Sequence, residues 1–491
     1  MTKIPSAMLI ASLALGGCGE GLTSKATPER LQALMATGLP ADHNDKITEE
    51  FTRIMSGNEA ALALTAQFAE GAKQPTTGAD LQQLMRAALA QNADIGRAAQ
   101  NVNAADSRRL NAIFGYTPQL RLTATYTQNN QNVVESDNAV FQRGQAQYPT
   151  IDGELTLTQP LLDVSRIYGI KLANRTRSRA EVDYVAAVHK AIYEVVDAYL
   201  QAAQSQQRVQ FLQRRARLLT QRVKAETVRG DLGLAEEATA NAIAIESADL
   251  QVDVAQERAR LSRILSDLVF MTGLPVTSVA RATLPRAARG TERSISADDA
   301  VTAALTNNPK ILSTIISVAE GDLRRKQAIA ADFAPVLEAF ASMRYEDREA
   351  SRFGGGSVTQ DAVFGVRLTV PLFNADGDGY ANLVARVDFR DAMIGYLRTR
   401  RQLSSEIRAT HARMAQLSRS IGQSGAAVSK ARQLVAAEKT LVEAGQSRPF
   451  AVAAREIQAV TAQERAAFYR IEYYREWAKF QYLSGTALVG S

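Results

Sequence analysis

Few side chains in this sequence are arranged for catalysis or metal binding. The segment Asn374–Gly379 has the spacing of the start of a calcium-binding loop, but the twelfth position is Ala385, so the bidentate carboxylate that such a loop requires is missing. His189 and His411 lie in helical patterns, and no carboxylate–histidine constellation surrounds either of them. Residues 422–425 lack the spacing of a nucleophile elbow. We therefore expect no catalytic residue, no metal site, no cofactor and no enzyme activity.

The single cysteine is the side chain with the most specific chemical prediction. Lys3 precedes an apolar run, residues 7–15, which is typical of a secretory signal and is too short to span a bilayer. The closing Leu15-Gly16-Gly17-Cys18 resembles the processing box of bacterial lipoproteins, although Gly16 departs from the residue usual there. We predict a signal peptide over residues 1–17 and lipidation of Cys18. A plain signal peptide with an incidental cysteine is the alternative.

The composition excludes several classes of protein. Of 491 residues 46% are hydrophobic and 22% charged, and 13 prolines and 30 glycines are too few for a collagen-like or low-complexity chain. One cysteine excludes a disulfide framework. The net charge of +6 is spread along the chain, so it gives no reason to expect nucleic-acid binding. The sequence contains no stretch of about 20 apolar residues, so it predicts no membrane-spanning helix.

Most of the chain is one unit present twice. Five pairs of segments match in the same order, at offsets from 371 − 160 = 211 to 335 − 118 = 217: 84–92 with 300–308, 116–120 with 333–337, 157–163 with 368–374, 229–230 with 444–445, and 271–273 with 483–485. Such an arrangement indicates a tandem duplication. The predicted boundaries are a tether or brace over 18–79, a first repeat over 80–273, a linker over 274–294 and a second repeat over 295–488.

Each repeat contains two segments in which hydrophobic and polar residues alternate. The hydrophobic positions are Leu120, Leu122, Ala124 and Tyr126; Ile151, Leu155 and Leu157; Leu337, Ala339, Ala341, Met343 and Tyr345; and Phe364, Val366, Leu368 and Val370. Alternation over about ten residues with an aromatic residue near the end is typical of a transmembrane β-strand. Polar loops over 129–147 and 346–360 are expected to join the strands. A soluble sheet with two different faces is the alternative.

A very long helix follows each pair of strands. No proline interrupts residues 164–229 or 379–444, and at 1.5 Å per residue each helix is roughly 100 Å long. Hydrophobic residues at heptad-like spacing predict packing on partner helices as a coiled coil. Gly230 and Gly445 are expected to break the helices, after which the chain returns to Gly273 and Gly485. Each repeat should therefore form a helical hairpin whose tip lies far from the strands.

The predicted strands require an oligomer. Four strands cannot close a barrel, and an open sheet edge in lipid would leave backbone groups unpaired. Barrels need at least about 8 strands, so two or three chains must combine theirs, which gives 4 × 2 = 8 or 4 × 3 = 12. Polar strand faces favour 12, because an eight-stranded barrel is filled by side chains. We predict an α+β fold in which three chains share a 12-stranded β-barrel and their hairpins form an α-barrel.

The order of these features resembles the TolC-type outer-membrane efflux family, which includes lipid-anchored members. The resemblance covers residues 80–488 and rests on Ala304–Pro309, the strand starts at Pro118 and Pro335, and the strand ends at 159–161 and 370–372. It implies a homotrimer anchored in the outer membrane, with its helical tunnel extending into the periplasm. The implied partners are a periplasmic adaptor protein, an energised inner-membrane pump and outer-membrane lipid.

The resemblance also gives the hairpin tips a role. The candidate adaptor-docking residues are Arg229, Gly230, Leu232, Gly445, Arg448 and Phe450. Family members often carry carboxylates shortly after the second glycine, where this sequence has Ala451 and Ala454, so we expect no acidic ring. We hypothesise that Glu236 and Arg448 form a gate pair that links neighbouring tips when the entrance is closed. Two exposed charges at helix ends, without a role in gating, are the alternative.

The leading functional prediction is a passive exit duct of a tripartite system that exports small toxic compounds or drugs. The outer-membrane component of a type I protein secretion system is an alternative of the same class. A periplasmic coiled-coil scaffold lipoprotein that forms no pore is the alternative from another class.

Overall fold

The computed structural model describes residues 75–135, 144–232, 237–280, 296–351, 354–371 and 380–485. The chain divides into two compact units, Met1–Gly71 and Ala72–Ser491, and all described residues belong to the second. The predicted signal peptide, Cys18 and most of the predicted tether lie outside the described residues. The same holds for Glu236 and for the calcium-loop-like segment 374–379.

The described residues form the same series of elements twice. The first series is α4 (Leu81–Gln91), α5 (Ala93–Phe114), β1 (Gln119–Val133), β2 (Gly144–Asp163), α6 (Val164–Asp231) and α7 (Glu237–Thr272). The second is α8 (Ala297–Asn307), α9 (Pro309–Phe333), β3 (Val336–Arg348), β4 (Ser357–Thr369), α10 (Ala381–Glu443) and α11 (Pro449–Ser484). The predicted α+β fold with a duplicated unit is confirmed.

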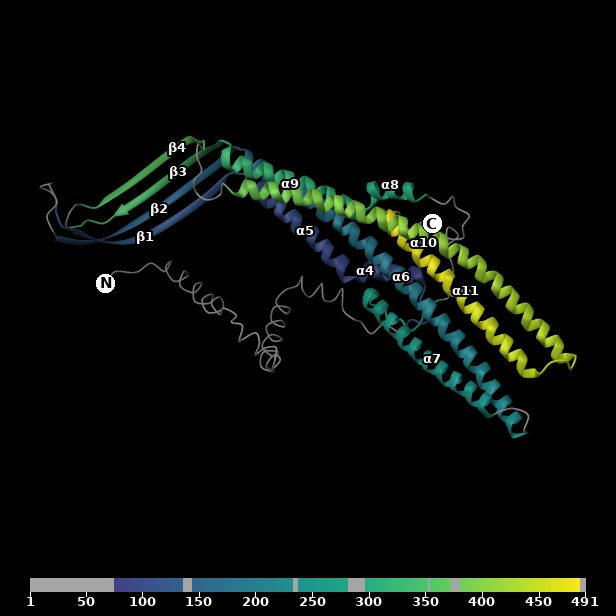
Figure 1. Ribbon diagram of the computed structural model, residues 1–491. Coiled ribbons are helices and arrows are strands. Elements are labelled where there is room, and N and C mark those ends of the chain that lie inside the picture. The colour runs from purple at the N-terminus through teal and green to yellow at the C-terminus, as the bar shows by residue number, and fades with distance from the viewer. Residues whose placement is uncertain are drawn as a thin grey trace, which may run out of the picture. The chain divides into compact units, whose positions relative to one another are not determined.

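The strands form one antiparallel sheet in the order β1-β2-β3-β4 (Figure 1). They are longer than predicted, because β1 continues to Val133 and β2 begins at Gly144, inside the expected loop 129–147. β3 and β4 likewise extend into the expected loop 346–360. Polar residues pair there, as Asn130 does with Gln147, since ladder hydrogen bonds need only backbone groups. Hydrophobic alternation therefore underestimated the length of the strands.

The end of β2 explains one of the repeated sequence patterns. The register between β2 and β3 shifts between Pro160 and Leu162, and a bulge is where a strand accommodates proline, which has no N–H to donate. Three residues later the Asp163 carboxylate accepts a hydrogen bond of 2.9 Å from the backbone N–H of Arg166 and caps α6. Strand and helix therefore join at Asp163 without an intervening loop.

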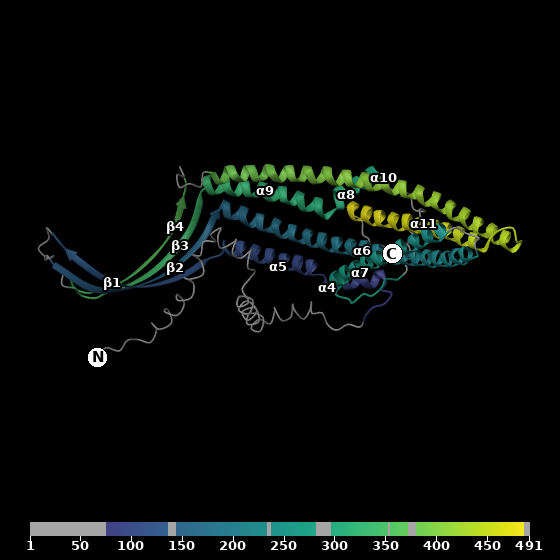
Figure 2. The ribbon, with the colours of Figure 1, turned by 60° about the horizontal axis from the view of Figure 1, so that its bottom comes forward.

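The helices pack in the same order as the strands they adjoin. α5 contacts α6, α6 contacts α9, and α9 contacts α10. α7 folds back on α6, while α11 folds back on α10 and also contacts α6, which produces two hairpins (Figure 2). α6 has 68 residues and α10 has 63, close to the predicted lengths. None of the described helices has the length and hydrophobicity needed to cross a membrane.

The two predicted glycine breaks differ. Gly445 has a φ of 70° and follows Ala444, which caps α10, so the left-handed conformation there ends the helix as expected. Gly230 lies inside α6, which continues to Asp231 and is capped by Leu232. The prediction that Gly230 breaks the first helix was therefore wrong, because glycine also adopts a helical conformation and α6 continues past it to Asp231.

The Asn308-Pro309 pattern connects the start of α9 to the end of α11 in the second repeat. Asn308 caps α9 by accepting a hydrogen bond from the backbone N–H of Lys310, and its Nδ2 donates to the carbonyl of Leu483, 2.9 Å away at the end of α11. Pro309 takes the first helical position, where no N–H is required. In the first repeat Asn92 caps α5 in the same manner, although Ala93 replaces the proline.

The hydrophobic core also follows the duplication. Leu84 and Ala88 of α4 are buried against α6 and α7, and Ala300 and Ala304 of α8, 300 − 84 = 216 residues later, are buried against α10 and α11. The heptad-like seams predicted for the long helices supply the partners, with Val195 and Tyr199 buried in α6 and Ile407 in α10. These two core clusters therefore lie midway along α6 and α10, where α7 and α11 end, and they hold the bases of the hairpins together.

Candidate functional site

The sheet has one polar face and one hydrophobic face, and its register aligns them across all four strands. A polar row consists of Thr123, Glu154, Arg344 and Asp361. The adjacent hydrophobic row consists of Leu122, Leu155, Met343 and Ala362. None of the described helices covers the hydrophobic face, where Leu122, Met343 and Phe364 are all exposed. A sheet of this kind can face lipid on one side and water on the other.

The dimensions of the sheet match a bilayer. The shortest strands, β3 and β4, have 13 residues each. At about 3.3 Å per residue and a tilt of about 45°, such a strand spans roughly 30 Å along the membrane normal, which is the thickness of the hydrocarbon core. β1 and β4 are the outer strands and pair with a neighbour on one side only. Their free backbone groups must be paired by another chain if the sheet enters lipid.

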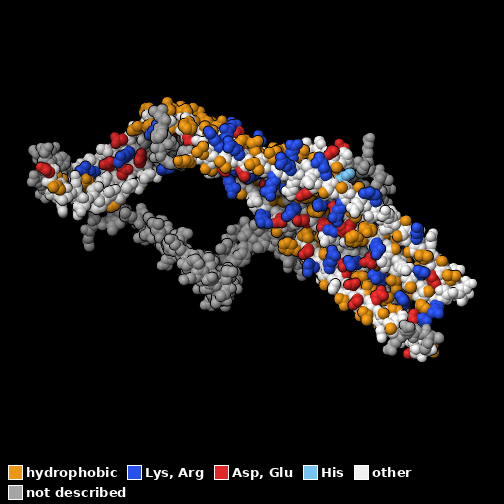
Figure 3. All heavy atoms as spheres, viewed as in Figure 1, with side chains coloured by type: hydrophobic (Ala, Val, Ile, Leu, Met, Phe, Trp, Pro, Cys, Tyr) orange, Lys and Arg blue, Asp and Glu red, His pale blue; other side chains and the backbone are white. Residues whose placement is uncertain are grey.

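The junction between sheet and helices carries exposed hydrophobic residues followed by basic ones. Phe114 ends α5, Phe333 ends α9 and Tyr380 precedes α10, and all three rings are exposed. Figure 3 shows hydrophobic side chains gathered at the junction, with Lys and Arg side chains on the adjoining parts of the helices. Aromatic residues at the edge of an apolar band and basic residues beyond it are typical of a membrane interface.

The tips of the two hairpins meet at Phe450. The guanidinium carbon of Arg229, at the end of α6, lies 4.8 Å from the centre of the Phe450 ring, and that of Arg448 lies 5.8 Å from it. Arg229 also pairs with the buried carboxylate of Glu226 at 2.8 Å. The ring at the start of α11 thus contacts cations from both hairpins, and each such contact contributes roughly 0.5–1 kcal/mol at an exposed site.

The structure places the predicted tip residues as follows. Arg229, Arg448 and Phe450 are brought together, whereas Leu232 and Gly445 are exposed at the turns. Gly230 lies in the last turn of α6. The gate pair stays a prediction, because Glu236 lies outside the described residues.

One comparison with known proteins identifies a family for part of the chain. Residues 84–239 match the family model described as outer membrane efflux protein. Residues 84–239 belong to the outer membrane efflux protein family. They contain α5, both strands of the first repeat and α6, and the second repeat has the same order of elements. No curated protein sequence is similar enough to match the chain.

Solved outer membrane efflux proteins share the fold over most of the chain. The Campylobacter jejuni CmeC outer membrane channel is similar with a TM-score of 0.70 and 14% identity, over 82% of this chain and 85% of that one. The outer membrane protein VceC of Vibrio cholerae gives 0.69 and 17%, over 83% and 97%. The open state of the Neisseria gonorrhoeae MtrE outer membrane channel gives 0.65 and 16%, over 83% and 89%.

The matched family has a known general class. Outer membrane efflux proteins are outer-membrane channels that extend into the periplasm, and they are not enzymes. This agrees with the sequence-based expectation of an outer-membrane protein without catalytic residues. Among the described residues no group of three or more His, Cys, Asp and Glu side chains is placed to hold a metal ion.

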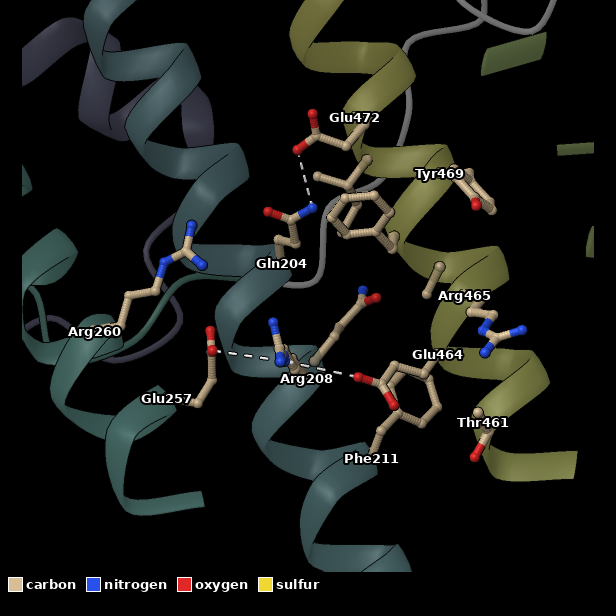
Figure 4. A pocket seen from close by; sticks show the side chains of 14 residues that line it. Gln204, Arg208, Phe211, Glu257, Arg260, Thr461, Glu464, Arg465, Tyr469 and Glu472 are labelled. Atoms are coloured by element: carbon tan, nitrogen blue, oxygen red, sulfur yellow. Dashed lines mark hydrogen bonds and ion pairs between the residues drawn. The ribbon is translucent and has the colours of Figure 1, made fainter. Parts of the chain in front are cut away.

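A groove of about 420 Å³ lies between α6, α7 and α11 (Figure 4). Arg208 of α6 spans it, 3.6 Å from the carboxylate of Glu257 on α7 and 3.7 Å from that of Glu464 on α11. Higher on the same helix Gln204 donates a hydrogen bond to Glu472, which also pairs with Arg475 at 2.8 Å. The ion pairs connect the first hairpin to the second.

Sequence reasoning missed these buried ionic contacts. Glu257 and Glu472 are buried, and Glu320 of α9 is completely buried beside Arg179 of α6. A single sequence with many charged residues on long helices gives no signal for which carboxylate faces inward. The sequence analysis predicted a role for Arg229 and for Phe450 but not their contact. Both residues lie close to the matching glycines of the hairpin tips, Gly230 and Gly445, and this placement could have indicated the contact.

Proposed function

We propose that this protein is the passive exit duct of an efflux system that exports small toxic compounds or drugs across the outer membrane. Three chains share a 12-stranded β-barrel in the membrane and a helical tunnel in the periplasm, and Cys18 carries the lipid anchor. A periplasmic adaptor protein and an inner-membrane pump deliver the cargo. The chain itself supplies a path and no chemistry.

The observation that carries this proposal is the open sheet. Its four strands are long enough to span a bilayer, present one polar and one hydrophobic face, and end in two unpaired edges. Joining β1 of one chain to β4 of the next pairs both edges, and three chains give 4 × 3 = 12 strands. A 12-stranded barrel is wide enough for an aqueous lumen, which the polar row through Glu154 and Arg344 would line.

The hairpin tips supply the docking surface in this proposal. Val228 and Leu232 are exposed beside Arg229, and Gly445 is exposed at the other turn, so the tips present hydrophobic and basic groups to an adaptor. Glu236 and Arg448 are proposed to link neighbouring tips in the closed state. Charge reversal at Arg448 should then raise single-channel conductance, and unchanged conductance would remove the gate pair from the proposal.

Single-channel recording of the purified full-length protein in planar bilayers tests the main proposal. Stepwise conductance from a protein that migrates as a trimer is the expected result. A protein that inserts but never conducts, or that stays monomeric and soluble without detergent, would instead support the scaffold alternative. Loss of polypeptide export in a deletion strain, with unchanged sensitivity to small toxic compounds, would support the type I secretion alternative.

A further inference from the structure

A second groove, of about 560 Å³, lies where α5 and α6 meet the sheet. Its rim includes Gln119, the first residue of β1, and Gly115, which caps α5. The next residue of the strand, Leu120, is exposed on the hydrophobic face. The groove therefore begins where the hydrophobic face of the sheet ends.

This position corresponds to the depth of lipid headgroups. Phe114 and Phe333 end the two helices that lead into β1 and β3, and both rings are exposed. Exposed aromatic residues at the end of an apolar band mark the boundary between hydrocarbon and headgroups in membrane barrels. A groove directly beside Phe114 thus faces the headgroups of the periplasmic leaflet.

Small side chains shape the groove. Ala112 lines it from α5, and Gly169 and Ala173 line it from α6. Glycine inside a helix is unfavourable by roughly 0.5–1 kcal/mol relative to alanine, so Gly169 needs a reason for its presence. A Cβ at Gly169 would lie 3.2 Å from Nε2 of Gln327, which also lines the groove. Glycine at this position keeps the floor of the groove open.

The groove carries a cation without a matching anion. Arg108 is exposed on its α5 side, and no carboxylate in the described part of the chain pairs with it. Arg166 lies on the α6 side, where its Nε is 2.9 Å from Asp163 and its Nη1 donates to the carbonyl of Gly115. These contacts hold the Arg166 guanidinium at the rim. The rest of the lining is mainly apolar, with Leu172 the largest apolar side chain.

We propose that this groove binds one anionic phospholipid of the periplasmic leaflet, an inference that rests on the proposed insertion of the sheet into the outer membrane. Arg108 and Arg166 contact the phosphate. The glycerol and the first methylene groups lie against Gly169, Leu172 and Ala173, and the acyl chains pass Gln119 into the bilayer. A lipid phosphate fits better than a free anion, because a free anion would leave the apolar wall of the groove in contact with water.

The groove between α6, α7 and α11 does not offer the same chemistry. Its lining holds three arginines, Arg208, Arg260 and Arg465, and three carboxylates, Glu257, Glu464 and Glu472, so the charges of this groove balance. The α5–α6 groove differs in three ways: two arginines and no carboxylate line it, its wall is mainly apolar, and it lies beside the hydrophobic face of the sheet. These three properties together select an amphiphile with a negative headgroup.

Native mass spectrometry of the full-length protein, released from detergent with equal amounts of phosphatidylglycerol and phosphatidylcholine, tests the site. One arginine near a membrane surface favours an anionic lipid by roughly five-fold, so we expect about that preference for phosphatidylglycerol. Arg108→Glu should abolish the preference. Arg419→Glu, which makes the same charge change at an exposed arginine of α10 outside the groove, should retain it. Equal loss in both variants would overturn the proposal, because it would indicate attraction by overall charge.

A measurement in a bilayer guards against a variant that misfolds or a contact made only in detergent. The chain has one tryptophan, so Leu172→Trp in a Trp477→Phe background places a single reporter in the groove. Brominated phosphatidylglycerol should quench this reporter at a mole fraction roughly five-fold lower than brominated phosphatidylcholine does. Equal quenching by the two lipids, or none, would overturn the site.

Conductance recorded on the same vesicles separates the two proposals. Channels without lipid preference would remove the lipid site and leave the duct intact. Absence of both insertion and conductance would refute the membrane function on which the lipid site rests.

Discussion

The buried carboxylate of Glu320 on α9 provides a test of how α6 and α9 are held together. Glu320 is 0% exposed, whereas its partners Arg179 and Arg324 have side chains that are 33% and 47% exposed. The shortest N–O distances are 3.0 Å to Arg179 and 3.6 Å to Arg324. The adjacent Gly321 packs against Phe389 of α10 and leaves no room for a Cβ to be added freely. The carboxylate therefore cannot reach water, although the arginines can.

This asymmetry sets the expected magnitudes. Removing one partner of a buried ion pair generally costs roughly 3–5 kcal/mol of unfolding free energy. We expect a smaller cost, about 2–3 kcal/mol, for Arg179→Ala, because Arg324 remains beside Glu320 and Arg179 is partly exposed to solvent. Glu320→Gln removes the buried charge and keeps the shape, so it should cost only about 1 kcal/mol. Adding Arg179→Ala to Glu320→Gln should then cost little more.

Urea unfolding of the detergent-solubilised protein, followed by far-ultraviolet circular dichroism, measures these differences as shifts of the midpoint at constant slope. Arg97→Ala is the matched control, because Arg97 pairs with Asp94 on an exposed surface and such pairs contribute about 0–1 kcal/mol. The reasoning is refuted if Arg179→Ala costs no more than Arg97→Ala. It is also refuted if the costs of Arg179→Ala and Glu320→Gln simply add in the double variant.

Three further outcomes follow from the structure. Gly485→Ala should destabilise the protein more than Gly445→Ala in the same urea assay. Both glycines have a φ near 70°, but a Cβ at Gly485 would lie 2.8 Å from the backbone of Asn308, whereas the space at Gly445 is open. Equal losses of unfolding free energy in the two variants would contradict this prediction. Burial raises the pKa of Tyr193 to about 12, with the Asp197 charge adding to the effect, so between pH 10 and 12 the unfolded chain loses this proton before the folded one and the free energy of unfolding falls as pH rises. Tyr193→Phe should flatten that fall, as a pH series of unfolding midpoints will show. Met343→Arg, near the middle of β3 on the hydrophobic face, should reduce insertion into vesicles measured by flotation, because a basic residue facing lipid costs roughly 2–4 kcal/mol at mid-depth, while Ser342→Arg on the polar face should insert normally.

Much of the fold was predictable because the sequence states it twice. The match between 84–92 and 300–308 locates two copies of one helix, and Leu84 and Ala300 proved to be equivalent core positions. Period-two alternation located all four strands, and the absence of proline located both long helices. These signals are local, since each depends on the periodicity of a single element.

The features that escaped prediction depend on contacts between elements. Strand ends beyond Tyr126 are polar and carry no alternation, so only pairing with another strand defines them. The contact of Arg229 with Phe450 joins residues far apart in sequence, and so does the pair of Arg179 with Glu320. Gly230 was read as a break because glycine often ends helices, yet glycine permits a helix as well as a turn.

The head-to-tail contacts within each repeat determine when each repeat can finish folding. Thr76 and Ala79 pair in parallel with Val276 and Val279, 276 − 76 = 200 residues later, and Asn308 bonds to Leu483, 483 − 308 = 175 residues later. Closing a loop of about 200 residues costs roughly 5 kcal/mol in chain entropy, so neither contact forms until its distant strand or helix is in place. The first repeat is therefore complete only when residue 279 is in place. The second repeat requires the last turn of α11, which carries Leu483. A chain that ends shortly before this residue would therefore hold a complete first repeat and an incomplete second one.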